Sequence, residues 1–228
     1  MPKVIPHEKI ENVFWIEFED KTKKLATKNL APGCKAYAEE KTFSDESGEY
    51  RIWDPYRSKL AAAILKGLEN VPIKAGTSVL YLGAASGTTA SFVSDLTGPR
   101  GKIFCVEISS RPLHDLMLLC SKRRNMCPIL ADARDPPSYS SLVNEVDVIY
   151  QDVAQPNQVE ILLENVKMFL RDGGHTIFAL KAKCIDVTKE PREIFRDEME
   201  KLEKEMEIID TKILDPYEKD HAMMILQK

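Results

Sequence analysis

The sequence predicts an α/β fold with a doubly wound, mainly parallel sheet of seven strands, preceded by a small antiparallel β domain. Three observations support this prediction. After residue 56, apolar runs of strand length alternate with amphipathic runs of helix length. The first strand and helix of this series, residues 78–97, are joined by a turn that begins and ends in glycine. The last two runs, 206–216 and 221–228, are separated by a short turn only, which predicts an antiparallel C-terminal strand at one edge.

Residues 1–55 are expected to form the small β domain. They contain four short runs rich in β-branched and aromatic residues, separated by Asp/Lys, Pro-Gly and Ser-Gly turn signals. These runs span residues 12–19, 23–30, 34–43 and 49–55. We therefore divide the chain into a β domain, residues 1–55, and a larger α/β domain, residues 56–228.

The larger domain is expected to begin with a helix over residues 57–70, which are rich in alanine and leucine. Before the final pair, strands are predicted over 78–84, 102–109, 126–133, 146–154 and 173–183. Helices are predicted over 88–97, 111–124, 157–170 and 191–205. Right-handed crossovers between parallel strands bring their carboxyl ends to one edge of the sheet, where ligands of such folds bind.

Composition narrows the function classes. The 228 residues contain 32 Lys and Arg against 36 Asp and Glu, a formal net charge of −4, so the chain alone is a poor non-specific binder of nucleic acid. The five cysteines form no CxxC pair, which indicates reduced thiols in a cytoplasmic protein. No signal peptide or apolar run of membrane-spanning length is found, so no membrane association is expected, and we assign no metal ligands.

The glycine turn indicates the class of ligand. Gly83 and Gly87 form a G-x-x-x-G pattern, and position 85, where a dinucleotide site requires its second glycine, is alanine. A nicotinamide cofactor presses its pyrophosphate against that position. S-adenosylmethionine carries no phosphate and tolerates the looser turn. The pattern therefore favours an S-adenosylmethionine site in a Rossmann-like sheet, with an NAD-dependent oxidoreductase as the alternative.

Acidic residues end three successive strands. Glu107 lies 24 residues after Gly83, near the spacing at which a carboxylate binds a ribose diol. Asp132 ends the third strand, where an adenine amino group would lie, and Asp152 ends the fourth. Each acid alone could equally well cap the helix that follows it. Three acids at three strand ends favour a ligand site.

Four further polar residues are expected near the same edge: Lys59 before the first strand, Asp152, Lys181 at the end of the fifth strand, and His221 at the start of the last. Taken one at a time, each of these four residues is typical of an ordinary protein surface. Lys181 follows the apolar run TIFAL, where a lysine needs a carboxylate partner, and Asp152 is the natural one. A lysine–aspartate pair can orient a ribose 2′-hydroxyl and stabilise the charge that develops on its oxygen during methyl transfer.

Longer motifs resemble those of one family. LATKNLAPG, YRIWDPYRSKLAAAI, VLYLGAASGTTAS, DVAQP, KAKCIDVT and LDPYEKDHAMMI are similar to segments of fibrillarin in its compact archaeal form. The resemblance implies a class I S-adenosylmethionine-dependent methyltransferase fold with a small N-terminal β domain. It also implies guide-RNA-directed ribose 2′-O-methylation of rRNA, and of tRNA in archaea. The implied partners are a Nop-family scaffold protein, a kink-turn-binding protein and the guide RNA of a box C/D ribonucleoprotein.

The resemblance also implies roles for individual residues. Lys59, Asp152, Lys181 and His221 correspond to the catalytic set. The first two expected cofactor contacts come from the glycine turn, and the others match the family's motifs. The full set is Gly83, Ala84, Thr88, Thr89, Glu107, Ile108, Asp132, Ala133, Asp152, Val153, Ala154 and Gln155.

Two departures from the family pattern have consequences. Ile108 occupies a position that is often aromatic, so its contact with adenine is expected to be aliphatic. The glycine/arginine-rich N-terminal region of eukaryotic members is absent from this sequence, which favours an archaeal, non-nucleolar protein. A non-catalytic assembly subunit that keeps the fold remains an alternative, and retention of the whole Lys-Asp-Lys-His set weighs against it.

Overall fold

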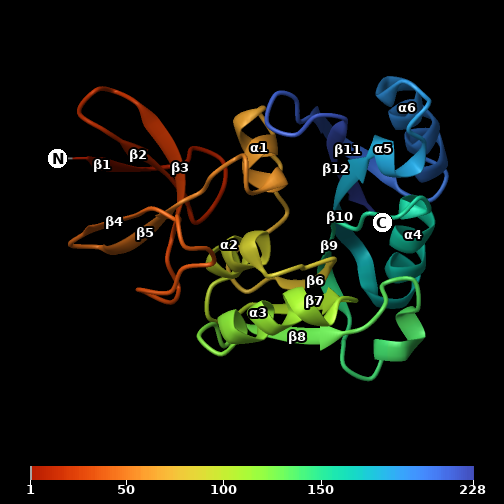
Figure 1. Ribbon diagram of the computed structural model, residues 1–228, viewed down its shortest axis with the longest axis horizontal. Helices are drawn as coiled ribbons and strands as arrows, with labels where there is room; N and C mark the ends of the chain where they lie inside the picture. The colour runs from red at the N-terminus through yellow and green to blue at the C-terminus, as the bar shows by residue number, and fades with distance from the viewer. Residues whose placement is uncertain (1) are drawn as a thin grey trace.

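The computed structural model describes residues 2–228 and confirms the predicted fold class, with a large mixed sheet and a separate antiparallel sheet (Figure 1). Within these residues the large sheet has seven strands: β6 (Ser78–Leu82), β7 (Lys102–Glu107), β8 (Met126–Leu130), β9 (Val146–Gln151), β10 (Leu170–Lys181), β11 (Glu207–Ile213) and β12 (His221–Gln227).

The spatial order of the large sheet is β11-β12-β10-β9-β6-β7-β8. The strands from β10 to β8 are parallel to one another, and β12 is antiparallel to both of its neighbours, as the short C-terminal turn predicts. From β6 the chain proceeds through β7 to one edge, and it then returns to place β9 on the other side of β6. This reversal opens a crevice at the carboxyl ends of β6 and β9, which is where doubly wound sheets bind ligands.

Helices cover both faces of the large sheet. On one face lie α1 (Lys59–Leu65), α2 (Thr88–Thr97) and α3 (Ser110–Cys120); on the other lie η1 (Pro136–Tyr139), α4 (Gln158–Phe169) and α6 (Pro191–Leu202), with the short α5 (Ala182–Ile185) beside α6. Alternate residues of one strand therefore enter different cores. In β6, Val79 and Tyr81 pack with α1–α3, and Leu80 and Leu82 pack with α4 and α6. Burial on both faces explains why the parallel strands are almost continuously apolar.

The N-terminal sheet has the order β1-β2-β3-β5-β4 and is antiparallel throughout. Its strands are β1 (Lys3–Pro6), β2 (Val13–Glu17), β3 (Lys23–Lys28), β4 (Thr42–Asp45) and β5 (Gly48–Ile52). Strand β1 was not predicted from the sequence. The boundary that we predicted after residue 55 falls between β5 and α1, and it stays a prediction.

The strand expected over residues 34–43 is wrong for most of its length, because only Thr42 and Phe43 belong to a strand. The preceding residues form a loop that turns the Glu40 side chain inward. Its carboxylate accepts the Ala36 amide hydrogen at 2.9 Å and binds the buried Arg51 guanidinium. In this conformation the buried Glu40 carboxylate is both paired and hydrogen-bonded, as a buried charge must be.

The N-terminal sheet packs onto α1 and α2 (Figure 1). The Trp53 indole stacks on the Phe92 ring of α2 with centroids 5.0 Å apart. Helix α1 is shorter than the expected 57–70, since the chain leaves it through Gly67 at a φ of +86°. None of the helices formed by residues 2–228 has the length and apolar character needed to span a membrane.

Candidate active site

The turn between β6 and α2 adopts a conformation that depends on its two glycines. Gly83 has a φ of +79°, and a Cβ atom there would lie 2.8 Å from the carbonyl oxygen of Asp152. Gly87 has a φ of +89°, and a Cβ there would lie 2.8 Å from the side chains of Leu116 and Leu119. The turn can therefore pass close to the end of β9 only because no side chain stands between them.

Two adjoining pockets open at this turn, with volumes of about 250 Å³ and 310 Å³. Both pockets are lined by Gly83, Ala85 and Asp152, so they form one cleft that bends around the end of β9. The first pocket extends over the ends of β7 and β8, and we call it the strand-end pocket. The second extends over the turn toward α1 and α2, and we call it the turn pocket.

Every residue predicted from the sequence to contact the cofactor lines this cleft. Those in the strand-end pocket are Gly83, Glu107, Ile108, Asp132, Ala133, Asp152, Val153, Ala154 and Gln155. Those in the turn pocket are Gly83, Ala84, Thr88, Thr89 and Asp152.

Glu107 ends β7 with its carboxylate held by backbone. The side chain is buried, and its two oxygens accept the amide hydrogens of Ala85 and Ser109, both at 2.8 Å. Ala85 belongs to the glycine turn, so this bond ties the carboxylate to the floor of the cleft. Ile108, which follows, is 56% exposed and offers an apolar surface to the strand-end pocket.

Asp132 is held by an arginine of its own loop. The Arg134 side chain donates hydrogen bonds to both carboxylate oxygens at 2.6–3.0 Å, and the Arg134 amide donates to Oδ1 at 2.9 Å. These hydrogen bonds hold the pKa of Asp132 below its ordinary value. Asp132 is therefore ionised and fixed in orientation at the edge of the strand-end pocket.

Three of the four residues proposed as catalytic meet where the two pockets join. Lys181 Nζ lies 2.7 Å from Asp152 Oδ1 and 3.0 Å from the Asp152 carbonyl oxygen. Lys59 Nζ lies 3.2 Å from both carboxylate oxygens of Asp152. The three side chains are each 13–16% exposed. Two ammonium groups thus share one carboxylate, and we call this arrangement the Lys-Asp-Lys cluster.

His221 lies next to this cluster, and its ring nitrogen hydrogen-bonds to a residue outside the cluster. It pairs with Lys181 in the register between β10 and β12. Its Nδ1 lies 2.6 Å from the Lys219 carbonyl oxygen and 3.9 Å from a carboxylate oxygen of Glu218. Glu218 itself lines the turn pocket, so the loop before β12 is part of the wall of the cleft.

Two tyrosines lie beneath the cluster. Tyr81 of β6 and Tyr150 of β9 stack with ring centroids 4.3 Å apart and an interplanar angle of 11°. Burial raises the pKa of both phenols well above the ordinary value, and the charge of Asp152 raises it further. Both phenols are therefore neutral, and they form a rigid base for the residues at the strand ends.

The Fibrillarin family model matches residues 4–228 of this sequence. The chain belongs to the fibrillarin family. It is 50% identical over 226 residues to the fibrillarin-like rRNA/tRNA 2′-O-methyltransferase of Methanopyrus kandleri, a match that covers 99% of this chain and 97% of that protein.

Two solved fibrillarin structures are similar over nearly the whole chain. The fibrillarin of Aeropyrum pernix, in complex with natively bound S-adenosyl-L-methionine, is 49% identical with a TM-score of 0.91, covering 98% of this chain and 97% of that one. A fibrillarin in complex with Nop5p is 40% identical with a TM-score of 0.86, covering 96% of this chain and 99% of that one.

Several residues of the cleft were not predicted from the sequence, among them Tyr56, Arg57, Arg134 and Glu218. Arg134 had a detectable signal, because an arginine two residues after an aspartate at a strand end can reach back to it. Tyr56, Arg57 and Glu218 lie in segments distant from the glycine turn. These segments precede α1 and β12, and the packing of α1 against β12 brings them to the site of this fibrillarin-family protein.

Proposed function

We propose that this fibrillarin-family chain is the catalytic subunit of a box C/D ribonucleoprotein. It transfers a methyl group from S-adenosylmethionine to a ribose 2′-hydroxyl of rRNA or tRNA that a guide RNA selects. The observation that carries the proposal is the Lys-Asp-Lys cluster at the junction of the two pockets. The name of the Methanopyrus kandleri relative, an rRNA/tRNA 2′-O-methyltransferase, supports it.

The cleft fits S-adenosylmethionine. Gly83 lets the turn close against the backbone of Asp152, and the pocket beside it is lined by the carboxylates of Glu107 and Asp132 and by the apolar Ile108, groups that suit a ribose and an adenine without phosphate. We assign Glu107 to the ribose hydroxyls, Ile108 to one face of adenine, and Asp132 to the adenine edge. The cofactor bound to the Aeropyrum pernix relative supports S-adenosylmethionine as the ligand of this cleft. When bound, the cofactor supplies a methyl group already activated by its sulfonium charge.

The protein accelerates the methyl transfer by positioning the reacting groups and by stabilising the charge that develops on them. Asp152 holds both ammonium groups, so Lys181 and Lys59 have fixed places beside the entering ribose. The cluster carries one more positive than negative charge, which stabilises the charge that develops on the 2′-oxygen as its proton leaves. Orientation of the hydroxyl for in-line attack supplies much of the remaining acceleration. Tyr81 and Tyr150, being neutral and buried, hold the strand ends without adding charge.

Partners complete the proposed particle. The relative solved with Nop5p supports a Nop-family scaffold protein as the direct partner. The net charge of −4 supports delivery of the substrate by a guide RNA and a kink-turn-binding protein, since the chain alone has little attraction for phosphates. We place the particle in the cytoplasm.

The test is assembly of the particle with guide RNA, target RNA and methyl-labelled cofactor. The wild type is expected to label the 2′-oxygen of the guided nucleotide. Lys181→Ala is expected to lower the rate about 10²–10³-fold, since a charge aimed at the reacting oxygen is lost. Calorimetry should show its cofactor affinity within a few-fold of wild type, because Lys181 is not among the assigned cofactor contacts.

Each outcome has a defined meaning. Near-normal turnover in Lys181→Ala would exclude the proposed role of the cluster. A complete particle whose wild-type protein transfers no methyl group would favour the non-catalytic assembly subunit. Calorimetric binding of NAD in place of S-adenosylmethionine would favour the oxidoreductase.

A further inference from the structure

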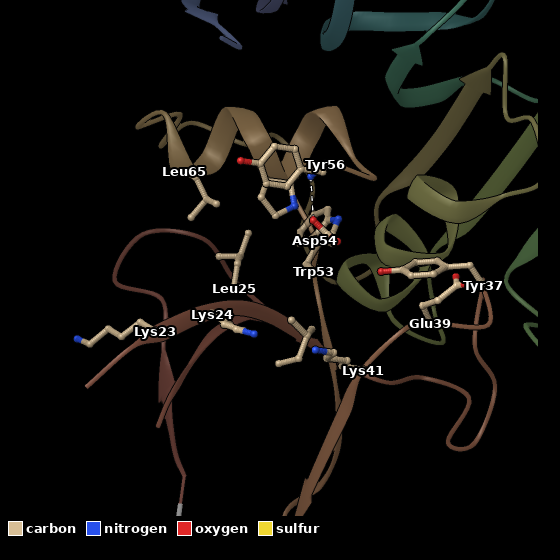
Figure 2. A pocket seen from close by; sticks show the side chains of 12 residues that line it. Lys23, Lys24, Leu25, Tyr37, Glu39, Lys41, Trp53, Asp54, Tyr56 and Leu65 are labelled. Carbon is tan, nitrogen blue, oxygen red and sulfur yellow. Dashed lines mark hydrogen bonds between the residues drawn. The ribbon is translucent and has the colours of Figure 1, made fainter. Parts of the chain in front are cut away.

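A second groove, of about 320 Å³, lies between the N-terminal sheet and α1 (Figure 2). Figure 2 shows Lys23, Lys24 and Lys41 on the sheet side of this groove and Tyr56 on the helix side. Its floor is apolar, because Leu25 and the indole of Trp53 line it while remaining buried. The groove thus combines exposed lysines, an exposed aromatic ring and an apolar floor, and we call it the lysine groove.

The lysine groove is continuous with the active site. Tyr56 lines both the lysine groove and the turn pocket, and its side chain is 65% exposed. Arg57 lines the turn pocket, and its guanidinium lies 5.0 Å above the ring of Tyr37, which lines the groove. One polymer chain can therefore pass from the Lys-Asp-Lys cluster over Tyr56 into the groove.

The side chains that line the groove have a positive net charge, whereas the net charge of the whole chain is negative. Two carboxylates line the groove: Glu39, which lies 3.6 Å from Arg57, and Asp54, which accepts the Tyr56 amide hydrogen. Outside the lining, Glu17 lies 3.3 Å from Lys23. Among residues 2–228, no carboxylate lies within 4.0 Å of the ammonium of Lys24 or Lys41; Lys24 Nζ lies 5.7 Å from the centre of the Phe18 ring, and Asp20 lies near enough to feel its charge. The lining of the groove therefore has three lysines and two carboxylates, although acidic residues outnumber basic ones in the whole sequence.

We propose that the lysine groove binds the RNA strand that flanks the nucleotide being methylated, an inference that rests on the proposed function. Lys24 and Lys41 contact its phosphates, and Tyr56 stacks on a base between the groove and the reacting ribose. Exposed lysines and a stacking aromatic ring are the combination that binds a nucleic acid strand without reading its sequence. Sequence-independent contacts suit an enzyme whose target is selected by a guide.

The test uses the assembled particle and target RNA that extends several nucleotides on both sides of the guided position. The variant K24E/K41E is compared with K102E/K204E, which makes the same change in charge at two exposed lysines outside the groove and the cleft. We expect K24E/K41E to raise the KM for RNA about tenfold at 0.1 M salt. The slope of log KM against log salt should fall by about 1.4, the value for two phosphate contacts with a single strand. K102E/K204E should stay within twofold of wild type.

A wild-type measurement tests the same inference without relying on the variants. Target RNA carrying 4-thiouridine at successive positions beside the guided nucleotide is irradiated in the particle, and the crosslinked peptides are identified by mass spectrometry. Crosslinks to the peptide that contains Tyr56 or Tyr37 are expected from one side of the target.

The outcomes separate this inference from the proposed function. If the wild-type particle transfers no methyl group, the proposed function fails. If it transfers methyl groups while K24E/K41E matches K102E/K204E, or crosslinks arise only outside the groove, the lysine groove does not bind the substrate. Loss of scaffold binding by K24E/K41E with an unchanged KM for RNA would assign the groove to a protein partner and overturn the inference.

Discussion

The protein has two groups of charged side chains, and they differ in charge balance and in access. One is the Lys-Asp-Lys cluster at the strand ends. The other, which we call the buried ion cluster, joins the N-terminal sheet to α2 and consists of Arg51, Arg123, Asp95 and Glu40. In the buried ion cluster the side chains of Arg51, Asp95, Glu40 and Arg123 are fully buried, with relative exposures of 0%.

The buried ion cluster is neutral and densely bonded. Asp95 accepts hydrogen bonds from Arg51 at 2.9 Å, Arg123 at 2.6 Å, the Thr27 hydroxyl at 2.7 Å and the Leu30 amide at 2.9 Å. Two guanidinium groups face two carboxylates. Burying charges costs free energy unless they are paired and hydrogen-bonded, and this arrangement offsets that cost.

The Lys-Asp-Lys cluster is unbalanced and accessible. Its two lysines share the single carboxylate of Asp152, which lines the cleft, and the three side chains are 13–16% exposed. One fold thus uses similar ion pairs for two purposes. A neutral, sealed cluster fixes structure, whereas an unbalanced cluster at a cleft keeps charge available for a substrate.

The largest effect on stability is expected from Asp95→Ala. It removes the acceptor of four hydrogen bonds and leaves two buried guanidinium groups with one carboxylate. We expect the free energy of unfolding to fall by about 3–5 kcal/mol, the usual cost of breaking a buried ion pair. Urea denaturation measures this loss, and Asp115→Ala is the control, since Asp115 lies exposed on α3. A loss no larger than that of the control would show that the buried ion cluster does not hold the two sheets together.

Asp152→Asn tests the other side of the comparison. The two lysines lose their shared counter-charge, so their ammonium groups no longer have fixed positions. We expect methyl transfer to fall about 10²-fold, because small displacements of catalytic groups cost this much. The free energy of unfolding should fall by about 1.5–3 kcal/mol, the value of hydrogen bonds to a charged group, since the three side chains are 13–16% exposed and asparagine can still accept a hydrogen bond. A stability loss equal to that of Asp95→Ala would contradict the distinction between the clusters.

The two clusters also differ in how well the sequence predicts them. Lys181 and Asp152 follow apolar runs that the alternation of strands and helices places side by side, so their pairing could be expected. Asp95 and its arginine partners are separated by 28 and 44 residues, and they lie in elements whose local patterns say nothing about one another. An arginine in a short β run is read as a surface residue, and only the packing of the N-terminal sheet on α2 buries Arg51.

Two errors in predicting the N-terminal sheet, the unpredicted β1 and the strand expected over residues 34–43, also arise where local sequence patterns are weak or overridden by distant contacts. The apolar periodicity of the large sheet is strong because its central strands are buried on both faces. Strand β1 has only four residues and an exposed edge, so its pattern is weak. The loop before β4 has aromatic and apolar residues typical of a strand, but its shape is decided by the distant Arg51, which binds Glu40.

Gly83→Ala tests the contact between the glycine turn and the Lys-Asp-Lys cluster. The new Cβ would lie 2.8 Å from the Asp152 carbonyl oxygen at a φ of +79°, so either the turn or the end of β9 must move. We expect calorimetry to show cofactor affinity lowered about tenfold, together with a stability loss of about 1–3 kcal/mol. Gly76→Ala is the matched control, because Gly76 has a φ of +89° and open space around its Cβ position. Gly76→Ala should lose stability and keep its affinity for the cofactor. Equal losses of cofactor affinity in both variants would show that the clash with Asp152 is not the cause.

Arg134→Gln is expected to have the smallest effect. Hydrogen bonds from Arg134 hold the pKa of Asp132 below the ordinary value of 3.8, so this pair contributes stability above that value and loses it as the pH falls through the lowered pKa. Without Arg134, the pKa of Asp132 should rise toward 3.8, so its protonation begins at a higher pH. An NMR titration of the Asp132 carboxyl carbon measures this shift, with Arg124→Gln, an exposed arginine outside the cleft, as the control. Cofactor affinity at neutral pH should fall only a few-fold, because Asp132 stays ionised and loses only its fixed orientation. An unchanged Asp132 titration in Arg134→Gln would show that the strand end itself, and not Arg134, keeps this carboxylate charged.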